Sequence, residues 1–237
     1  MVNKMKIAIL ADVHSNIVAL TGVMKDIKRQ ACHKIFVLGD MIGYYYKPSE
    51  VIDTFMGDAD CFVIRGNHEE LFLESLSSEK LALDYHNNYG NGLRFCTETL
   101  SEAQILWLRS LPSSLEVELD GLKIGLYHGS DKSIDEYIYP DTISGRIDKF
   151  ERKYDHIFLG HTHYPVVFNH KGSLIINPGS VGQPRDIGSL ASYAILNTVN
   201  GAVTFRRVEF DSEGLCDEVK KVDPMHPYLH EIMRRNR

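Results

Sequence analysis

Side chains that bind metals and transfer protons follow a series of apolar, strand-like runs in this sequence of 237 residues. In chain order these groups are Asp12-Val13-His14, Gly39-Asp40, Gly66-Asn67-His68, His128-Gly129 and Gly160-His161-Thr162-His163. Each motif alone is weak evidence, because such short patterns occur by chance. Five of them in order, each at the end of a strand-like run, predict a shared metal centre.

The spacing and the types of these side chains indicate which metals they suit. Asp12 and His14 are two residues apart, as are His161 and His163. In an extended segment, the members of such a pair project to the same side. Carboxylate, imidazole and amide groups without thiolate favour Mn, Fe, Zn, Ni or Co. Seven ligands exceed the needs of one tetrahedral ion, whereas two divalent or trivalent ions that share a carboxylate use them all, with Asp40 as the expected bridge.

Alternating strands and helices are expected to position the first three groups. Strand-like runs over 6–11, 34–38 and 61–64 alternate with helical patterns over 17–30 and 49–55. This βαβ order predicts parallel strands. The carboxyl ends of parallel strands share one sheet edge, which is where open α/β sheets bind ligands.

The second half of the chain is richer in strands. Further strand-like runs cover 115–119, 122–127, 156–159, 173–176, 189–197 and 202–210. Asn200-Gly201, between the last two runs, predicts an antiparallel hairpin. We therefore predict an α/β fold, a four-layer αββα sandwich of two mixed β-sheets flanked by helices.

No internal repeat or linker divides the chain, so residues 1–237 are expected to form a single domain. Within it, 69–111 has a mostly helical pattern, with a capping box at Ser101 and Gln104, and is a candidate cap over the site. Residues 223–237 contain two prolines and a basic end, and are expected to form either a helix or a loosely held tail.

Composition and charge exclude several classes of protein. A net charge of −6 argues against a stable complex with nucleic acid. Four cysteines without a C-x-x-C pair form neither a zinc knuckle nor a disulfide framework, and fit a reducing compartment. The first six residues lack the apolar core of a signal peptide, and no apolar stretch approaches the ~18 residues that span a bilayer. We expect a cytoplasmic protein with no membrane partner; its oligomeric state is left open.

Taken together, the motifs resemble the calcineurin-like metallophosphoesterase family, whose pattern is D-x-H, G-D, G-N-H-[DE], H and G-H-x-H. The resemblance extends to Asn177-Pro178-Gly179-Ser180 and so covers most of the chain. Within the family, the chain is similar to small bacterial and archaeal phosphodiesterases and to the diadenosine-tetraphosphatase-like branch. Part of that likeness lies in Gly39 to Tyr44 and in Pro48-Ser49-Glu50.

The resemblance also implies a role for each residue of the site. One ion would be held by Asp12, His14, Asp40 and His163. The other would be held by Asp40, Asn67, His128 and His161. A hydroxide that bridges the ions would attack phosphorus in line, and His68 would protonate the leaving oxygen as general acid. At the position of Glu69 the family usually has Asp, and that carboxylate orients the histidine. The longer Glu69 side chain would orient His68 with a different geometry.

Two further side chains are candidates for substrate binding. Arg185 suits a phosphate clamp because a guanidinium fork matches phosphate oxygens, although an ion pair with Asp186 is the alternative. Asn16 is a candidate phosphate contact, although an N-cap on the following helix is the simpler role. The run Tyr44-Tyr45-Tyr46 either stacks on a nucleobase or divides between packing and surface.

The resulting hypothesis is a metal-dependent hydrolase of small phosphate esters, a phosphodiesterase or phosphatase that acts on substrates such as nucleotides or dinucleoside polyphosphates. One alternative is a non-catalytic scaffold or binding protein on the same fold, which the complete ligand set and His68 disfavour. Another is a serine/threonine protein phosphatase, which the modest chain length disfavours.

Overall fold

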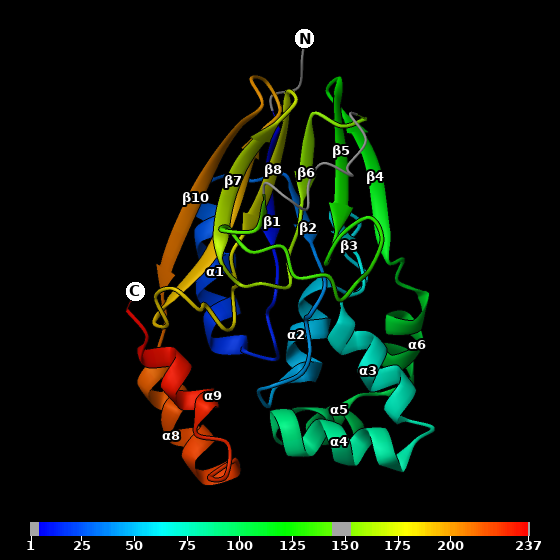
Figure 1. Cartoon of the computed structure of the whole chain (residues 1–237), viewed down its shortest axis with the longest axis vertical. Coiled ribbons are helices and arrows are strands. Elements are labelled where there is room, and N and C mark those ends of the chain that lie inside the picture. Colours follow the sequence, from blue (N-terminus) through cyan, green and yellow to red (C-terminus); the bar gives the residue numbers. More distant parts are fainter. Residues whose placement is uncertain (1–4, 144–152, 237) are drawn as a thin grey trace.

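The computed structural model describes residues 5–143 and 153–236 as two β-sheets that pack face to face (Figure 1). Residues 1–4, most of the N-terminal segment considered above, lie outside the described residues, as does Arg237 of the C-terminal segment. Each sheet has five strands and contains both parallel and antiparallel pairs.

The N-terminal strand lies at the centre of the first sheet. Its strands in spatial order are β10 (Ala202–Glu209), β9 (Leu190–Asn197), β1 (Lys6–Leu10), β2 (Lys34–Val37) and β3 (Cys61–Val63). β1, β2 and β3 pair in parallel, as the βαβ pattern predicts. β9 pairs with β1 in the antiparallel sense and forms the predicted hairpin with β10.

The second sheet contains one strand that the sequence pattern does not predict. Its strands in spatial order are β4 (Ser114–Leu119), β5 (Leu122–Tyr127), β6 (His156–Phe158), β8 (Ser173–Pro178) and β7 (Pro165–His170). β7, the strand that was missed, lies at the sheet edge and alternates half-buried and exposed residues along most of its length. Proline at its first position suits an edge strand, because proline offers no N–H to the ladder.

Helices cover the outer face of the first sheet and the loop end of both sheets (Figure 1). In chain order they are α1 (Ile17–Arg29), α2 (Pro48–Phe55), α3 (Asn67–Ser75), α4 (Glu79–Tyr89), α5 (Gly92–Thr99), α6 (Glu102–Ser110), α8 (Ser212–Val222), α9 (Tyr228–Glu231) and the 3-10 helix η2 (Ile232–Arg234). The predicted α/β sandwich of two mixed sheets with flanking helices is confirmed. The segment 69–111 is helical, and its capping box at Ser101 and Gln104 is present. Within 5–143 and 153–236, no helix has the length and apolar character needed to cross a membrane.

Alternate side chains of β1 belong to two different layers of the sandwich. Ile7 and Ile9 are fully buried in the core between the two sheets, with Phe158 from the second sheet. Ala8 and Leu10 point to the other side, where they pack with α1 and α2. Because both faces of β1 are covered, its sequence is a nearly continuous apolar run rather than an alternating one.

The C-terminal segment is packed against the rest of the protein by short helices. Leu229 and Ile232 are buried in a cluster with Tyr45 and Tyr46. The Asp223 carboxylate accepts a hydrogen bond from the Tyr46 hydroxyl at 2.8 Å and others from Asn91, whose backbone N–H lies at 3.1 Å. Of the two alternatives for this segment, a loosely held tail is therefore excluded for the residues described.

Candidate active site

Loops at the carboxyl ends of β1, β2, β5 and β6, together with the start of α3 after β3, bring all the predicted ligands into one buried cluster. These ligands are Asp12, His14, Asp40, Asn67, His128, His161 and His163. None of them exposes more than 9% of its surface. The parallel strands of each sheet end side by side, which explains how five distant segments meet at one place.

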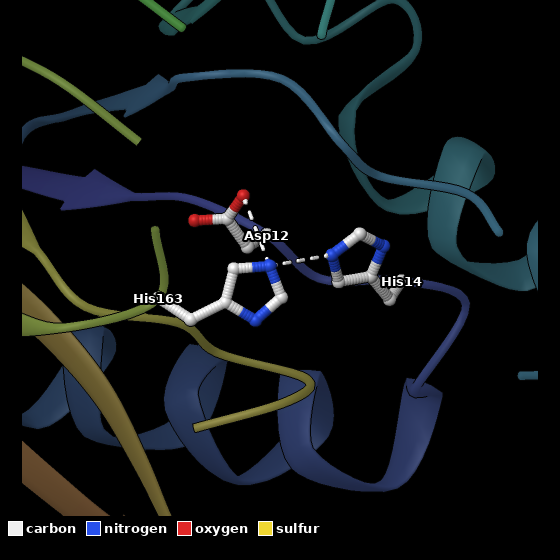
Figure 2. Close-up of side chains that lie close together, drawn as sticks. All are labelled: Asp12, His14 and His163. Carbon is white, nitrogen blue, oxygen red and sulfur yellow. Dashed lines mark hydrogen bonds and ion pairs between the residues drawn. The ribbon is translucent and has the colours of Figure 1, made fainter. Parts of the chain in front are cut away.

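The first group of ligands comprises Asp12, His14 and His163 (Figure 2). His163 Nε2 lies 3.7 Å from Asp12 Oδ1 and 3.1 Å from His14 Nε2. Figure 2 shows the three side chains pointing toward one another from the loop after β1 and the loop after β6. These three ligand atoms lie within the span that one ion could coordinate.

The second group comprises Asp40, His128 and His161, with Asn67 beside it. His128 Nε2 lies 3.3 Å from Asp40 Oδ2 and 2.9 Å from Asn67 Oδ1. Asp40 Oδ2 also lies 3.8 Å from His14 Nε2, which belongs to the first group. The same carboxylate oxygen therefore faces both groups.

Backbone carbonyls set the orientation of three of the histidines. Nδ1 of His14, His128 and His163 lies 3.1, 2.6 and 2.7 Å from the carbonyls of Ile42, Leu38 and Gln183, respectively. A carbonyl only accepts hydrogen bonds, so each Nδ1 carries a proton and donates it. In metal sites this arrangement leaves Nε2 as the ligand atom and fixes the ring.

The unpaired atoms of the cluster fit bound cations. Asp12 Oδ2 and His161 Nε2 are buried without a hydrogen-bond partner in the described part of the chain. The His14 and His163 Nε2 atoms face each other at 3.1 Å with Nδ1 of each already donating elsewhere, so two lone pairs are directed at one point. Buried polar atoms without partners are costly, and bound metal ions would satisfy these.

The ligand loops adopt an unusual backbone conformation. Five ligand residues have φ between 51° and 68°, namely Asp12, His14, Asp40, His161 and His163. Non-glycine residues in this left-handed region cost roughly 1–3 kcal/mol each, and they occur most often at functional sites. Inter-loop hydrogen bonds hold the strained loops, among them His14 N–H to the Asp40 carbonyl at 2.9 Å.

Glu69 has a different role from the one that the family resemblance implied. Its carboxylate accepts hydrogen bonds from the backbone N–H groups of Asp40, Met41, Ile42 and Gly66, at 2.8 to 3.1 Å. It therefore fixes the loop of the shared carboxylate rather than the His68 ring. The cause is its place as the third residue of α3, from which a carboxylate folds back onto the N-cap, here Gly66.

His68 is oriented by Tyr85 of α4, a residue that the sequence analysis missed. His68 Nδ1 lies 2.9 Å from the Tyr85 hydroxyl, which also accepts the Tyr44 N–H at 3.3 Å. Burial raises the pKa of Tyr85 well above its ordinary value, so the phenol keeps its proton and can donate it to Nδ1. The proton of a neutral His68 then lies on Nε2, which faces Asp40 Oδ2 at 4.0 Å.

Comparison with known proteins identifies the family. The sequence pattern of the calcineurin-like phosphoesterase superfamily domain matches residues 5–201. The chain belongs to that superfamily. Over 236 residues it is 35% identical to an uncharacterised protein of Methanocaldococcus jannaschii, with 92% of this chain and 93% of that protein covered.

Two solved structures share the fold over nearly the whole chain. A metallophosphoesterase from Sphaerobacter thermophilus is 30% identical, with a TM-score of 0.80 and 98% of each chain covered. A hypothetical protein from Pyrococcus horikoshii is 23% identical, with a TM-score of 0.83; the match covers 98% of this chain and 99% of that protein's chain. The second likeness concerns the fold alone.

Burial and neighbouring charges shift the pKa values of the candidate ligands in opposite directions. Burial lowers the pKa of His14 and His163 well below the ordinary value and that of His161 to about 3. It raises the pKa of the Asp12 carboxyl to about 7. Burial also lowers the pKa of His128, but the adjacent Asp40 carboxylate outweighs it and raises that pKa to about 10. An ion would displace the protons held by these last two groups.

The two predicted substrate contacts, Arg185 and Asn16, differ in whether their side-chain atoms have hydrogen-bond partners within the described part of the protein. Arg185 does not pair with Asp186, which instead binds Arg207. Within the described residues, the buried Nε of Arg185 has no hydrogen-bond partner. Asn16 is buried, its Oδ1 accepts the Ala19 N–H at 3.1 Å and its Nδ2 donates to a backbone carbonyl. The N-cap role of Asn16 is therefore observed, and its side-chain atoms are occupied within the protein.

The three adjacent tyrosines separate into two roles. Tyr45 and Tyr46 are buried in the cluster beneath α8 and α9, where Tyr45 donates to the Leu229 carbonyl at 3.1 Å. Tyr44 belongs to the same buried cluster and also lies against the site, with its ring centroid 4.6 Å from that of His14 and 4.8 Å from that of His68. Stacking on a substrate is thus excluded for Tyr45 and Tyr46, and only Tyr44 borders the site.

Proposed function

We propose that this protein hydrolyses phosphate esters with the help of two divalent or trivalent metal ions. The observation that carries the proposal is the position of Asp40 Oδ2, which faces His14 on one side and His128 on the other. One ion would take Asp12, His14, Asp40 and His163. The other would take Asp40, Asn67, His128 and His161. The neutral and carboxylate donors of both sets suit Mn, Fe, Zn, Ni or Co.

The remaining groups would act on the substrate around these ions. When bound, the ions supply an activated water as the nucleophile and neutralise the charge of the phosphate. His68 would hold a proton at Nε2 and deliver it to the leaving oxygen. Tyr85 would keep that tautomer by donating to Nδ1. Glu69 would keep Asp40 in place through the loop N–H groups.

Hydrolysis of bis(p-nitrophenyl) phosphate tests this proposal directly. The protein is stripped with a chelator and reloaded with each of the five metals, and nitrophenol release is followed from neutral to alkaline pH. We expect release with at least one metal, loss on chelation and recovery on reloading. Metal-loaded, folded protein that releases nothing with any of the five metals would contradict the proposal. p-Nitrophenyl phosphate, measured in parallel, separates diesterase from monoesterase activity.

A further inference from the structure

A cavity of about 510 Å³ lies beside the metal cluster. Its lining comes from the loop after β2, from α4, from the segment after β5, from the loop after β8 and from the C-terminal segment. The volume falls within the ~300–1,000 Å³ of small-molecule sites. Tyr44 lines the side of the cavity that borders the cluster, where its ring contacts those of His14 and His68. A ligand in the cavity would therefore lie next to the metal ions.

Three exposed aromatic rings converge on this cavity from separate segments. Tyr89 of α4, Tyr137 after β5 and Tyr228 of α9 expose 37%, 44% and 39% of their surface, respectively, and all three line it. The Tyr137 ring lies 3.9 Å from that of His161, and the Tyr89 ring 5.8 Å from that of His68. Exposed rings gathered from distant segments around one cavity are typical of a binding site for a flat apolar group.

Arg185 adds a positive charge to the same cavity. Its side chain is half-buried, and in the described part of the chain its Nε is buried without a hydrogen-bond partner. Arg185 lines the same cavity as Tyr44 and Tyr137, whose rings contact those of His14 and His161. A guanidinium with free donors suits an anionic oxygen, such as that of a phosphate.

The cavity also carries polar side chains at its outer part. Asn88 and Glu231 are exposed there and belong to α4 and α9. Asn offers donors and an acceptor, and an ionised Glu offers acceptors. A hydrocarbon ring would leave these groups without partners, whereas a nucleobase combines an aromatic face with a polar edge.

We propose that this cavity binds a nucleotide, with the base between the exposed tyrosines and with Arg185 on the phosphate. The inference rests on the proposed function in one respect, because the phosphate is taken to reach the metal ions as a substrate. It goes further in naming the substrate class and the residues that select it. Tyr89, Tyr137 and Tyr228 recognise the base, and Arg185 recognises the phosphate independently of the base.

The test compares two ligands that share a sugar and a phosphate but differ in the base. Isothermal titration calorimetry of the Mn²⁺-loaded protein, at low temperature to suppress turnover, measures the binding of AMP and of ribose 5-phosphate. Stacking of one base on aromatic side chains is expected to make AMP bind at least about tenfold more tightly. Tyr89→Ala and Tyr228→Ala should each reduce this ratio to about threefold or less.

Two further variants serve as controls. Leu83→Ala removes an exposed side chain from the same helix as Tyr89, outside the cavity, and should leave the ratio unchanged. Arg185→Gln should weaken both ligands by about tenfold and so preserve the ratio.

The outcomes separate this inference from the proposed function. Equal affinity for AMP and ribose 5-phosphate in the unaltered protein would overturn the inference, as would a ratio that neither tyrosine variant changes. Hydrolysis of bis(p-nitrophenyl) phosphate is measured on the same preparations. Intact hydrolysis without base selectivity refutes the inference alone, whereas base selectivity without hydrolysis under any metal refutes the proposed function alone.

Discussion

Replacing Tyr85 with phenylalanine tests how the proton of His68 is positioned. The substitution removes one hydroxyl and leaves the ring, which is buried among Tyr44, His68 and Tyr89. His68 Nδ1 loses the partner at 2.9 Å that fixes the proton on Nε2. The Tyr44 N–H also loses its acceptor. The ring stays in place, so the change acts on hydrogen bonding rather than on packing.

The size of the effect follows from the hydrogen bonds lost. A net contribution of about 1–1.5 kcal/mol from the bond to His68 corresponds to a five- to tenfold lower kcat where protonation of the leaving oxygen limits the rate. Nitrophenol leaves readily without protonation, so its esters should lose less than about twofold. A poor leaving group, such as the alcohol of an alkyl ester, should show the full loss. The orphaned Tyr44 N–H should also destabilise the fold by about 1–3 kcal/mol.

The assay compares kcat for a p-nitrophenyl ester and an alkyl phosphate ester in the unaltered protein and the variant. Tyr46→Phe is the matched control, because it removes another buried hydroxyl, one that is bonded to Asp223 at 2.8 Å rather than to His68. It should lower thermal stability without changing the ratio of the two kcat values. An equal loss of activity on both esters in Tyr85→Phe, or no loss on either, would refute the positioning role.

Three further predictions concern the proposed metal site. Asp40→Asn removes the charge of the shared carboxylate. Elemental analysis should then find fewer than two ions per chain, and the rate of hydrolysis should fall by at least about a hundredfold. Two tightly held ions in this variant would contradict the bridging role. The affinity of the ion-free protein for Mn²⁺ should rise with pH from 6 to 8, by up to about tenfold per pH unit for each proton released. The sign follows from the pKa values of about 7 for Asp12 and about 10 for His128, because a protonated ligand must lose its proton to bind the ion. Calorimetry in buffers of different ionisation enthalpy would reveal the released protons. An Mn²⁺ affinity that does not change with pH would exclude this linkage. Glu69→Gln replaces a carboxylate that accepts hydrogen bonds from four N–H groups by an amide with one acceptor oxygen. It should lower the free energy of unfolding, measured by chemical denaturation, by roughly 2–4 kcal/mol and should weaken metal binding. An unchanged free energy of unfolding would show that water replaces the carboxylate.

The sequence predicted which residues gather in the buried cluster, because their signal is local. Each ligand follows an apolar run, and the run is readable because both faces of strands such as β1 are covered by other layers. β7 lacked that signal, since an edge strand that is half exposed has a weak apolar pattern. The position of Glu69 was readable in principle, because a Glu at the third position of a helix can accept a hydrogen bond from the N–H of the residue before the helix, here Gly66.

The substrate side of the site was less predictable because it depends on packing between distant segments. Tyr85 and Tyr89 reach His68 only because α4 packs on α3, and Tyr228 reaches the same cavity only because Asp223 fixes the C-terminal segment to Asn91. The local pattern around each of these tyrosines is that of an ordinary helix. Whether Arg185 pairs with Asp186 likewise depends on a distant segment, because Asp186 pairs with Arg207 of strand β10.

The central place of β1 in the first sheet affects how the protein is made. Its two neighbours are β2, which follows soon after it in the chain, and β9, whose Asn197 pairs with Lys6. On the ribosome, β1 therefore keeps one open, apolar edge until almost the whole chain has emerged. During that interval the nascent chain is exposed to misplaced strand pairing, and the loop that carries Asp12 and His14 lacks one of the strands that hold it. A chaperone that shields exposed apolar strands should therefore improve the yield of soluble protein more than added metal does.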